Sequence, residues 1–349
     1  MSSKLALIAI TGLTISAVSL SAAAMVGGKE LHDKGGWEKI FNNINWGDRP
    51  SCSFGPQKTS VTRNVNWNES SEVSIRAPAT VHYRPGSKND VTLTGDPELL
   101  SHITVKDGEI DLDCSPRDRD VHLDITLPGK IFQGISIAGD AKLILEELNQ
   151  DNLSLDLGGS ASAEASGRVD HLDLSMAGSG QANTDKLSVQ RLELNIAGGG
   201  RAQASAEESA DVSIAGSGKA FLNSHNSMRK VEVSIAGSGT ITGSGKSESL
   251  YVSIMGSGDA NLGELQVQRA DISIAGNGNT AIAAAESAEI NIMGSGDVRL
   301  LTEPKKLESN IAGSGRVMHA SGEVTERSRT SGPMPPMPPM PPMPPMPSR

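Results

Sequence analysis

Gly245, Lys246 and Ser247 end a glycine-rich stretch in the way that the phosphate-binding loop of many nucleotide-binding proteins ends. In that loop another glycine stands five residues before the glycine of Gly-Lys-Ser, because the backbone amides between them cradle the phosphate. Here that position is Thr240, and the nearest glycine, Gly239, is one residue too early. No apolar residues at helical spacing follow. The sequence therefore argues against a nucleotide site.

Three histidines are spaced by close to one repeat of the chain. His82, His102 and His122 are each twenty residues apart, and each falls on the polar phase of an alternating segment. Stacked in a row, their imidazoles would suit zinc. We keep this as a secondary hypothesis, and our leading expectation is that the chain uses no metal and no cofactor.

The C-terminal tail carries soft ligands at another regular spacing. Its sequence PMPPMPPMPPMPPMPSR is typical of a polyproline II helix, whose three residues per turn would align the thioethers along one edge. Thioethers suit Cu(I), so copper binding is an alternative to the favoured interpretation, an extended spacer or tether. The methionines concerned are Met334, Met337, Met340, Met343 and Met346.

Carboxylates that could serve a glycan-cleaving enzyme gather in one stretch. They alternate with apolar residues, which places most of them on a solvent face rather than in a cleft. Only Phe221 and Tyr251 are aromatic between residues 136 and 320, so sugar platforms are scarce. We expect no catalytic residue here. The stretch contains Glu109, Asp111, Asp113, Asp118, Asp120 and Asp124.

A repeated motif occupies the middle of the chain and determines where the candidate residues lie. An apolar residue, a small residue or Met, and a glycine recur at intervals of 18 to 21 residues. The ten motif glycines are Gly139, Gly159, Gly178, Gly198, Gly216, Gly237, Gly256, Gly276, Gly294 and Gly313. A fixed period without long insertions leaves no room for the loops that wall an enzyme cleft.

Each repeat alternates apolar and polar residues, as Val231, Val233 and Ile235 do around Glu232 and Ser234. This pattern predicts a strand with one buried face. A unit of about twenty residues cannot bury that face alone, so the units must stack as a β-solenoid of about ten coils. A polar row lies beside the motif, and we interpret it as a structural ladder: Ser136, Ser175, Asn195, Ser213, Ser234, Ser253, Ser273, Asn291 and Asn310.

Composition and targeting signals divide the chain. The formal net charge of -10 argues against nucleic acid as a partner. Residues 1–24 have the basic start, apolar run and small residues of a signal peptide. Residues 25–59 form a linker with a possible capping helix at Trp37 to Ile44, and residues 321–349 form a disordered tail. After export, Cys52 and Cys114 could form one disulfide.

Residues 60–320 resemble the auto-transporter adhesin head GIN domain family of bacterial envelope proteins. The resemblance is carried by VTLTGDPELLSHITVKDGEIDLDC (91–114), VHLDITLPG (121–129), ISIAGDAKL and the glycine array that follows. It implies an exported domain with a right-handed parallel β-helix, and it supplies no catalytic residues.

We therefore expect a non-enzymatic exported scaffold that serves adhesion or binding in the periplasm or at the cell surface, with an unknown envelope or surface partner. One alternative is a structural rod that self-associates through the solenoid ends. A second alternative is a glycan-active β-helix enzyme.

Overall fold

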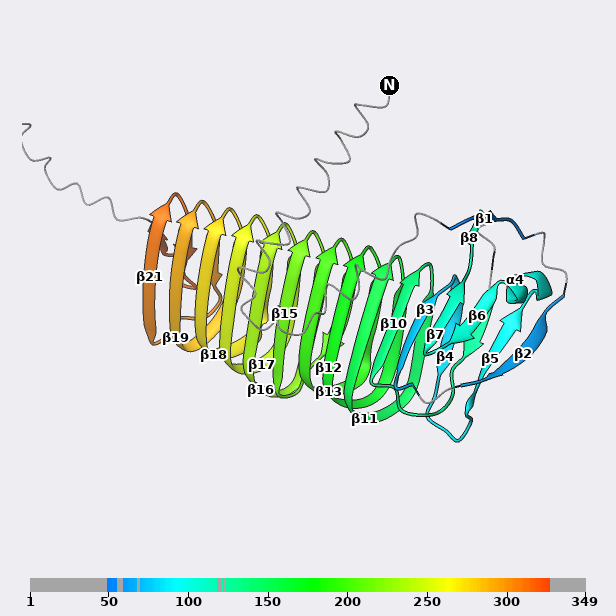
Figure 1. Ribbon diagram of the computed structural model, residues 1–349. Helices are drawn as coiled ribbons and strands as arrows, with labels where there is room; N and C mark the ends of the chain where they lie inside the picture. Colours follow the sequence, from blue (N-terminus) through cyan, green and yellow to red (C-terminus); the bar gives the residue numbers. More distant parts are fainter. Residues whose placement is uncertain (1–48, 55–58, 68–69, 118–120, 122, 327–349) are drawn as a thin grey trace, which may run out of the picture.

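The computed structural model describes residues 49–54, 59–67, 70–117, 121 and 123–326. It is a β-solenoid of about nine turns, in which 74% of the described residues are in strands and 2% are in a helix. Figure 1 shows the coils stacked side by side along a rod. The expected all-β solenoid is confirmed. The signal segment, the capping helix and the methionine tail lie outside the described residues.

The regular coils are built from strands that run through one coil after another. They are β10 (Gly134–Gly139), β11 (Lys142–Gly159), β12 (Ser162–Gly178), β13 (Gln181–Gly198), β14 (Arg201–Ser205), β15 (Ser209–Gly216), β16 (Lys219–Gly237), β17 (Thr240–Gly256), β18 (Asp259–Gly276) and β19 (Asn279–Gly294). Neighbouring coils pair in parallel, so the solenoid is held by hydrogen bonds between coils.

The motif glycines stack in register along the whole rod. Gly139 pairs with Gly159, Gly159 pairs with Gly178, and the series continues without a break to Gly294 and Gly313. All ten have a positive φ. This alignment confirms the stacking that the repeat spacing predicts.

Close approach of backbones explains why this corner needs glycine. Gly256 has a φ of 123°, and a Cβ atom added there would lie 2.5 Å from the carbonyl oxygen of Gly237 on the previous coil. The same carbonyl accepts a hydrogen bond of 2.8 Å from the amide of Ser257. A side chain at Gly256 would therefore disturb both the backbone conformation and the hydrogen bond between coils.

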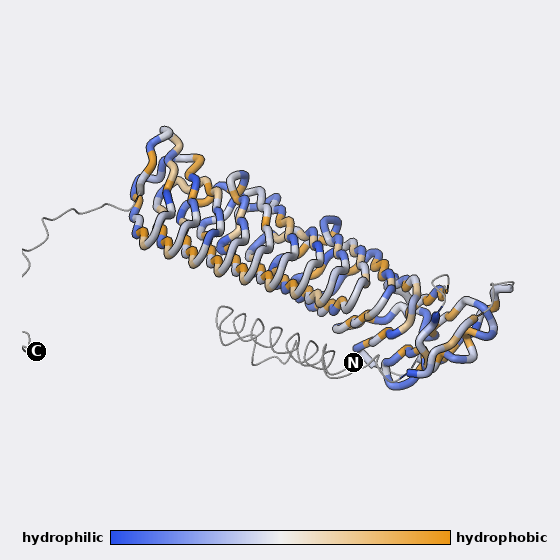
Figure 2. The backbone as a smooth tube through the Cα atoms, turned by 90° about the horizontal axis from the view of Figure 1, so that it is seen from above, coloured by the Kyte–Doolittle hydropathy of each residue, from blue (hydrophilic) through white to orange (hydrophobic). Residues whose placement is uncertain are grey.

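Inward residues form rows of aliphatic side chains that make one continuous core. The row formed by the apolar residue of each motif, two residues before the motif glycine, is buried from Ile137 to Ile292. The alternation of hydrophobic and hydrophilic residues along each coil is visible in Figure 2. Burial on one side of each strand thus follows the two-residue period of the sequence.

The N-terminal coils do not stack in chain order. Strands β3 (Glu72–Arg76) and β4 (Ala79–Tyr83) pair with β10 and β11 on one side. On the other side they pair with β7 (Glu109–Leu112) and β9 (Leu123–Thr126), which come later in the sequence. The first coil of the rod is therefore formed by β7 and β9, although β3 and β4 come before them in the sequence.

Antiparallel strands cover that first coil. Strand β6 (Ile103–Lys106) pairs with β7, while β5 (Asp90–Gly95) pairs with β9 and with β2 (Val61–Asn66). A short helix, α4 (Pro97–Ser101), joins β5 to β6. Asp96 caps it by accepting a hydrogen bond of 2.9 Å from the amide of Glu98. A strand that approached this end would find the edges of β7 and β9 already paired.

The C-terminal end is closed only in part. Strands β20 (Asp297–Leu300) and β22 (Arg316–Met318) continue one side of the solenoid, and β23 (Val324–Glu326) covers β22 in the antiparallel direction. On the other side, β21 (Lys306–Gly313) pairs with β19 and has no second strand beside it among the described residues. Its inward row ends in Ser309, where earlier coils carry Ile, Leu or Val.

Candidate binding face

The Gly-Lys-Ser tripeptide lies within a strand. Gly245, Lys246 and Ser247 belong to β17, which continues as strand to Gly256. The hydroxyl of Ser247 is buried and donates a hydrogen bond of 3.0 Å to the carbonyl of Ser249. These residues therefore serve the coil rather than a phosphate.

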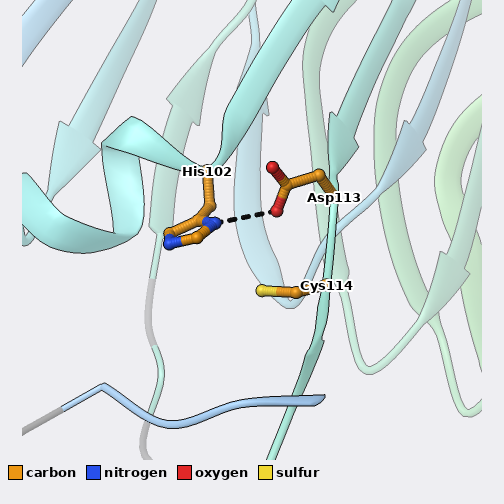
Figure 3. Close-up of side chains that lie close together, drawn as sticks. All are labelled: His102, Asp113 and Cys114. Atoms are coloured by element: carbon orange, nitrogen blue, oxygen red, sulfur yellow. Dashed lines mark hydrogen bonds and ion pairs between the residues drawn. The ribbon is translucent and has the colours of Figure 1, made fainter. Parts of the chain in front are cut away.

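The histidines that suggested a metal row are not stacked. His82 in β4 lies opposite Thr126 on one side and Ile144 on the other. His102 follows α4, and its Nδ1 atom lies 2.8 Å from Oδ1 of Asp113, as Figure 3 shows. The idea of a row is wrong for these two because they lie on different parts of the N-terminal end. His122 is outside the described residues.

His102, Asp113 and Cys114 lie close enough together to suggest another metal site (Figure 3). Cys114, however, is bonded to Cys52, with 5.8 Å between their Cα atoms. A sulfur in a disulfide is not a thiolate and does not offer the usual cysteine ligand. The disulfide joins Cys52, in β1 (Ser51–Cys52), to the residue that precedes β8 (Ser115–Pro116). These two strands also pair with each other in parallel.

Asp111, from the acidic stretch, lies between two arginines. The Arg49 guanidinium donates to both oxygens of Asp111, at 2.8 and 3.1 Å, and the Arg76 Nε atom lies 3.3 Å from Oδ1. Arg76 also bonds Glu109 at 2.9 Å. These carboxylates therefore hold the N-terminal end together. Asp118 and Asp120 are outside the described residues.

An acidic row runs along the outward face of the strand segments that precede the motif glycines. Each member lies three residues before the motif apolar residue and faces its equivalent on the next coil. Tyr251 takes one place in this row, between Glu232 and Asp271. The carboxylates are Asp173, Glu193, Asp211, Glu232, Asp271, Glu289 and Glu308.

A second outward row is formed by the residues that come two positions before each member of the acidic row in the chain. From Arg191 onward it alternates cations with serines, coil by coil, to Lys306. Two of its cations pair with the acidic row: Lys230 with Glu232 at 2.5 Å, and Lys306 with Glu308 at 2.7 Å. We call the surface made by these two rows the charged face. The members of the second row are Arg191, Ser209, Lys230, Ser249, Arg269, Ser287 and Lys306.

The charged face is hollowed near its C-terminal end. An open hollow of about 250 Å³ lies where Ser249 and Ser287 stand on either side of Arg269. Serine is much smaller than Lys or Arg, so the alternation leaves space between the cations. Asp271, Glu289 and the ring of Tyr251, which is 43% exposed, also line the hollow.

Two carboxylates in the hollow lie next to each other. Asp271 and Glu289 lie opposite each other in register, and neither has a hydrogen bond or ion pair within the described part of the chain. Partial burial, followed by the neighbouring Glu289 charge, raises the pKa of Asp271. The guanidinium of Arg269 contacts the hydroxyl of Ser249 at 3.4 Å instead.

The polar row beside the motif lies next to the acidic row on the same strands. Ser175 and Asn195 are buried, and both contact an acidic neighbour two residues earlier: Asp173 at 3.4 Å and Glu193 at 3.4 Å. Ser175 and Asn195 also lie opposite each other in register on neighbouring coils, which agrees with a structural ladder. The sequence interpretation missed the charge of the neighbouring row, although counting back three residues from each motif would have found it.

Within the described residues, no helix is long and apolar enough to cross a membrane.

The stacked coils place the protein among the β-solenoids. The profile of the family described as "Putative auto-transporter adhesin, head GIN domain" matches residues 70–226 and 219–304. The chain belongs to this family, as the motifs suggest. No curated protein matches the sequence.

Several solved structures are similar to this chain. A "putative lipid binding protein" from Parabacteroides distasonis is 18% identical, with a TM-score of 0.44. A "putative adhesin" from the same organism is 19% identical, with a TM-score of 0.45, and another from Parabacteroides merdae is 14% identical, with a TM-score of 0.44. Each alignment covers 77% of this chain and 99% of the other chain.

Proposed function

We propose that this protein is an exported, non-enzymatic binding module that presents its charged face to a partner surface in the bacterial envelope. The observation that carries the proposal is the pair of outward rows: one is acidic except at Tyr251, and the other alternates cations with serines from coil to coil. Inward residues repeat because they must pack, but outward residues are not under that constraint. A repeated outward pattern of charge is therefore best accounted for by a surface that must be recognised.

The family supports export and adhesion as the setting of this function. In this proposal, residues 1–24 direct export and are removed, and the part of the tail that follows β23 (Val324–Glu326) serves as a spacer. The binding domain itself spans residues 60–320 and lies in the periplasm or at the cell surface.

Two alternatives have less support. Stacking of copies end to end would need open edges at both ends, whereas β5 and β6 occupy the edges of the first coil. A glycan-cleaving enzyme would need a general acid and a second carboxylate facing a bound sugar in a cleft. The hollow at Asp271 and Glu289 is open, and these carboxylates lie side by side on paired strands rather than on opposite walls of a cleft.

A charge-reversal experiment tests the proposal. The chain from residue 25 onward is labelled, and its binding to envelope fractions of the producing bacterium is titrated. The double variant Glu193→Lys with Glu232→Lys reverses two charges on the charged face, and we expect binding to weaken about tenfold, equivalent to about 1.4 kcal/mol.

The matched control is Glu164→Lys with Asp259→Lys, which makes the same change on the strand segments after the motif glycines. Glu164 is ion-paired with Lys142, as Glu232 is with Lys230, so the local chemistry is comparable. Equal binding by both double variants and the wild type would contradict a role for the charged face. Release of new reducing ends from envelope polysaccharide would instead indicate an enzyme.

A further inference from the structure

The hollow around Tyr251 differs from the rest of the charged face in having an aromatic wall. Tyr251 stands where the neighbouring coils carry Glu232 and Asp271. The Nζ atom of Lys230 lies 5.3 Å from the centroid of its ring, and this cation–π contact helps to hold the ring in place. A held, partly exposed aromatic ring offers an apolar surface at little entropic cost.

Hydrogen-bonding groups of both kinds surround this ring. Arg269, Ser249 and Ser287 offer donors, while Asp271 and Glu289 offer carboxylate oxygens that accept no hydrogen bond within the described chain, although the charge of Glu289 interacts with that of Lys306. A ligand that satisfies this set must donate and accept hydrogen bonds at closely spaced points. Hydroxyl groups do both.

The charges of the lining disfavour charged ligands. An ammonium group that approached Asp271 would also meet Arg269 and Lys306, and a sulfate or carboxylate that approached Arg269 would meet Asp271, Glu289 and Glu308. A neutral ligand avoids both repulsions. Apolar C–H groups of the same ligand would pack on the ring of Tyr251.

The direction of the rows fits a linear ligand. Neighbouring coils stand about 4.8 Å apart, a distance similar to the length of one pyranose ring, and the donor and acceptor rows run parallel to the rod axis. A chain of sugars lying along the axis would meet the same two rows at each ring.

We propose that the hollow around Tyr251 is a binding site for a neutral, hydroxyl-rich glycan segment, held by stacking on Tyr251 and by hydrogen bonds to Arg269, Asp271 and Glu289. This inference rests on the proposed binding function and specifies the class of ligand at one part of the charged face. It assigns a use to one of the two aromatic residues between positions 136 and 320.

A glycan array followed by titration calorimetry tests the inference with the chain from residue 25 onward. The array carries neutral oligosaccharides of hexoses and N-acetylhexosamines, sulfated oligosaccharides and tetralysine. We expect binding to at least one neutral oligosaccharide. Tyr251→Ala should weaken this binding about tenfold or more, which corresponds to about 1.4 kcal/mol, whereas Tyr251→Phe should retain most of it.

Two control variants keep the result specific to the hollow. Phe221→Ala removes the other aromatic ring, which lies after a motif glycine and is stacked on Arg201 at 4.3 Å. Glu164→Gln removes a carboxylate from the strand segments after the motif glycines, away from the charged face. Both should bind the oligosaccharide as the wild type does. Thermal unfolding of each variant checks that the chain is folded.

The result that would overturn the inference is binding of sulfated oligosaccharides or tetralysine alone, no binding of any neutral oligosaccharide, or neutral binding that Tyr251→Ala leaves unchanged. The envelope-binding assay separates this failure from failure of the proposed function. If the wild type binds envelope fractions through the charged face but binds no neutral oligosaccharide, only the glycan inference is wrong.

Discussion

Asp271 and Glu289 face each other in register on neighbouring coils, and neither carboxylate has an ion-pair partner among the described residues. Like charges directly opposite each other on paired strands are destabilising. The protein thus keeps an unfavourable pair on its surface at the hollow. Such a pair is understandable if a bound ligand satisfies it.

Asp271→Asn should therefore stabilise the protein at pH 7, by no more than a few tenths of a kcal/mol to about 1 kcal/mol. The pKa of Asp271 is raised in the folded state. The stability that its protonated carboxyl contributes is therefore fully present below the unfolded-state pKa, and it is lost as the pH rises through the folded-state pKa. The gain from Asp271→Asn should shrink in acid and in high salt. Denaturant titration at several pH values measures this, with exposed Asp151→Asn as the control.

Gly256→Ala should destabilise the protein strongly. The φ of 123° alone costs a side-chain-bearing residue about 1–3 kcal/mol, and the new Cβ would also press on the carbonyl of Gly237. Gly199→Ala is the matched control, because Gly199 lies in the same kind of corner and its nearest neighbour would be 3.8 Å from the added Cβ. Equal melting temperatures for the two variants would contradict the account of the glycine column.

Loss of the disulfide should loosen the N-terminal end. Cys52 and Cys114 are separated by 62 residues, and closing a loop of that size stabilises a fold by about 4 kcal/mol in the chain-entropy model. We expect Cys52→Ser with Cys114→Ser to lower the denaturant midpoint and to speed proteolysis near Arg49. Reducing agent should affect the wild type in the same direction and leave the double variant unchanged.

The inward position of Ser309 leads to a prediction about self-association. Earlier coils carry Ile, Leu or Val in this row, whereas the last coil presents Ser309 beside the charged residues Lys306 and Glu308. Polar terminal repeats keep solenoids from stacking further. Light scattering should find a monomer for the wild type and larger species for Ser309→Ile. Polymers of the wild type would contradict this interpretation.

The sequence predicted the solenoid well because its signal is periodic. Motif glycines such as Gly216 and Gly237 need one backbone geometry, and aliphatic residues such as Val233 need burial, so both repeat at each coil. The stacking of β7 and β9 outside β3 and β4 could not be predicted, since it depends on pairings between distant segments of irregular length.

The candidate site was visible in the sequence only in part. Tyr251 was noted as a rare aromatic, but its meaning depends on its neighbours across coils, Glu232 and Asp271, which lie about one repeat away in the chain. The hollow itself arises from Ser249 and Ser287, whose small size matters only once Arg269 is seen between them. Aligning the repeats by their motif glycines would have revealed the rows but not the hollow.

Carboxyl footprinting of the protein bound to envelope fractions tests most directly whether binding uses the charged face. Exposed carboxylates are labelled with and without the envelope material, and the labelled peptides are quantified by mass spectrometry. We expect protection of Asp271 and Glu289, with Glu98 and Glu164 labelled as before. Unchanged labelling of Asp271 and Glu289, together with protection of Glu98 or Glu164, would contradict binding through the charged face.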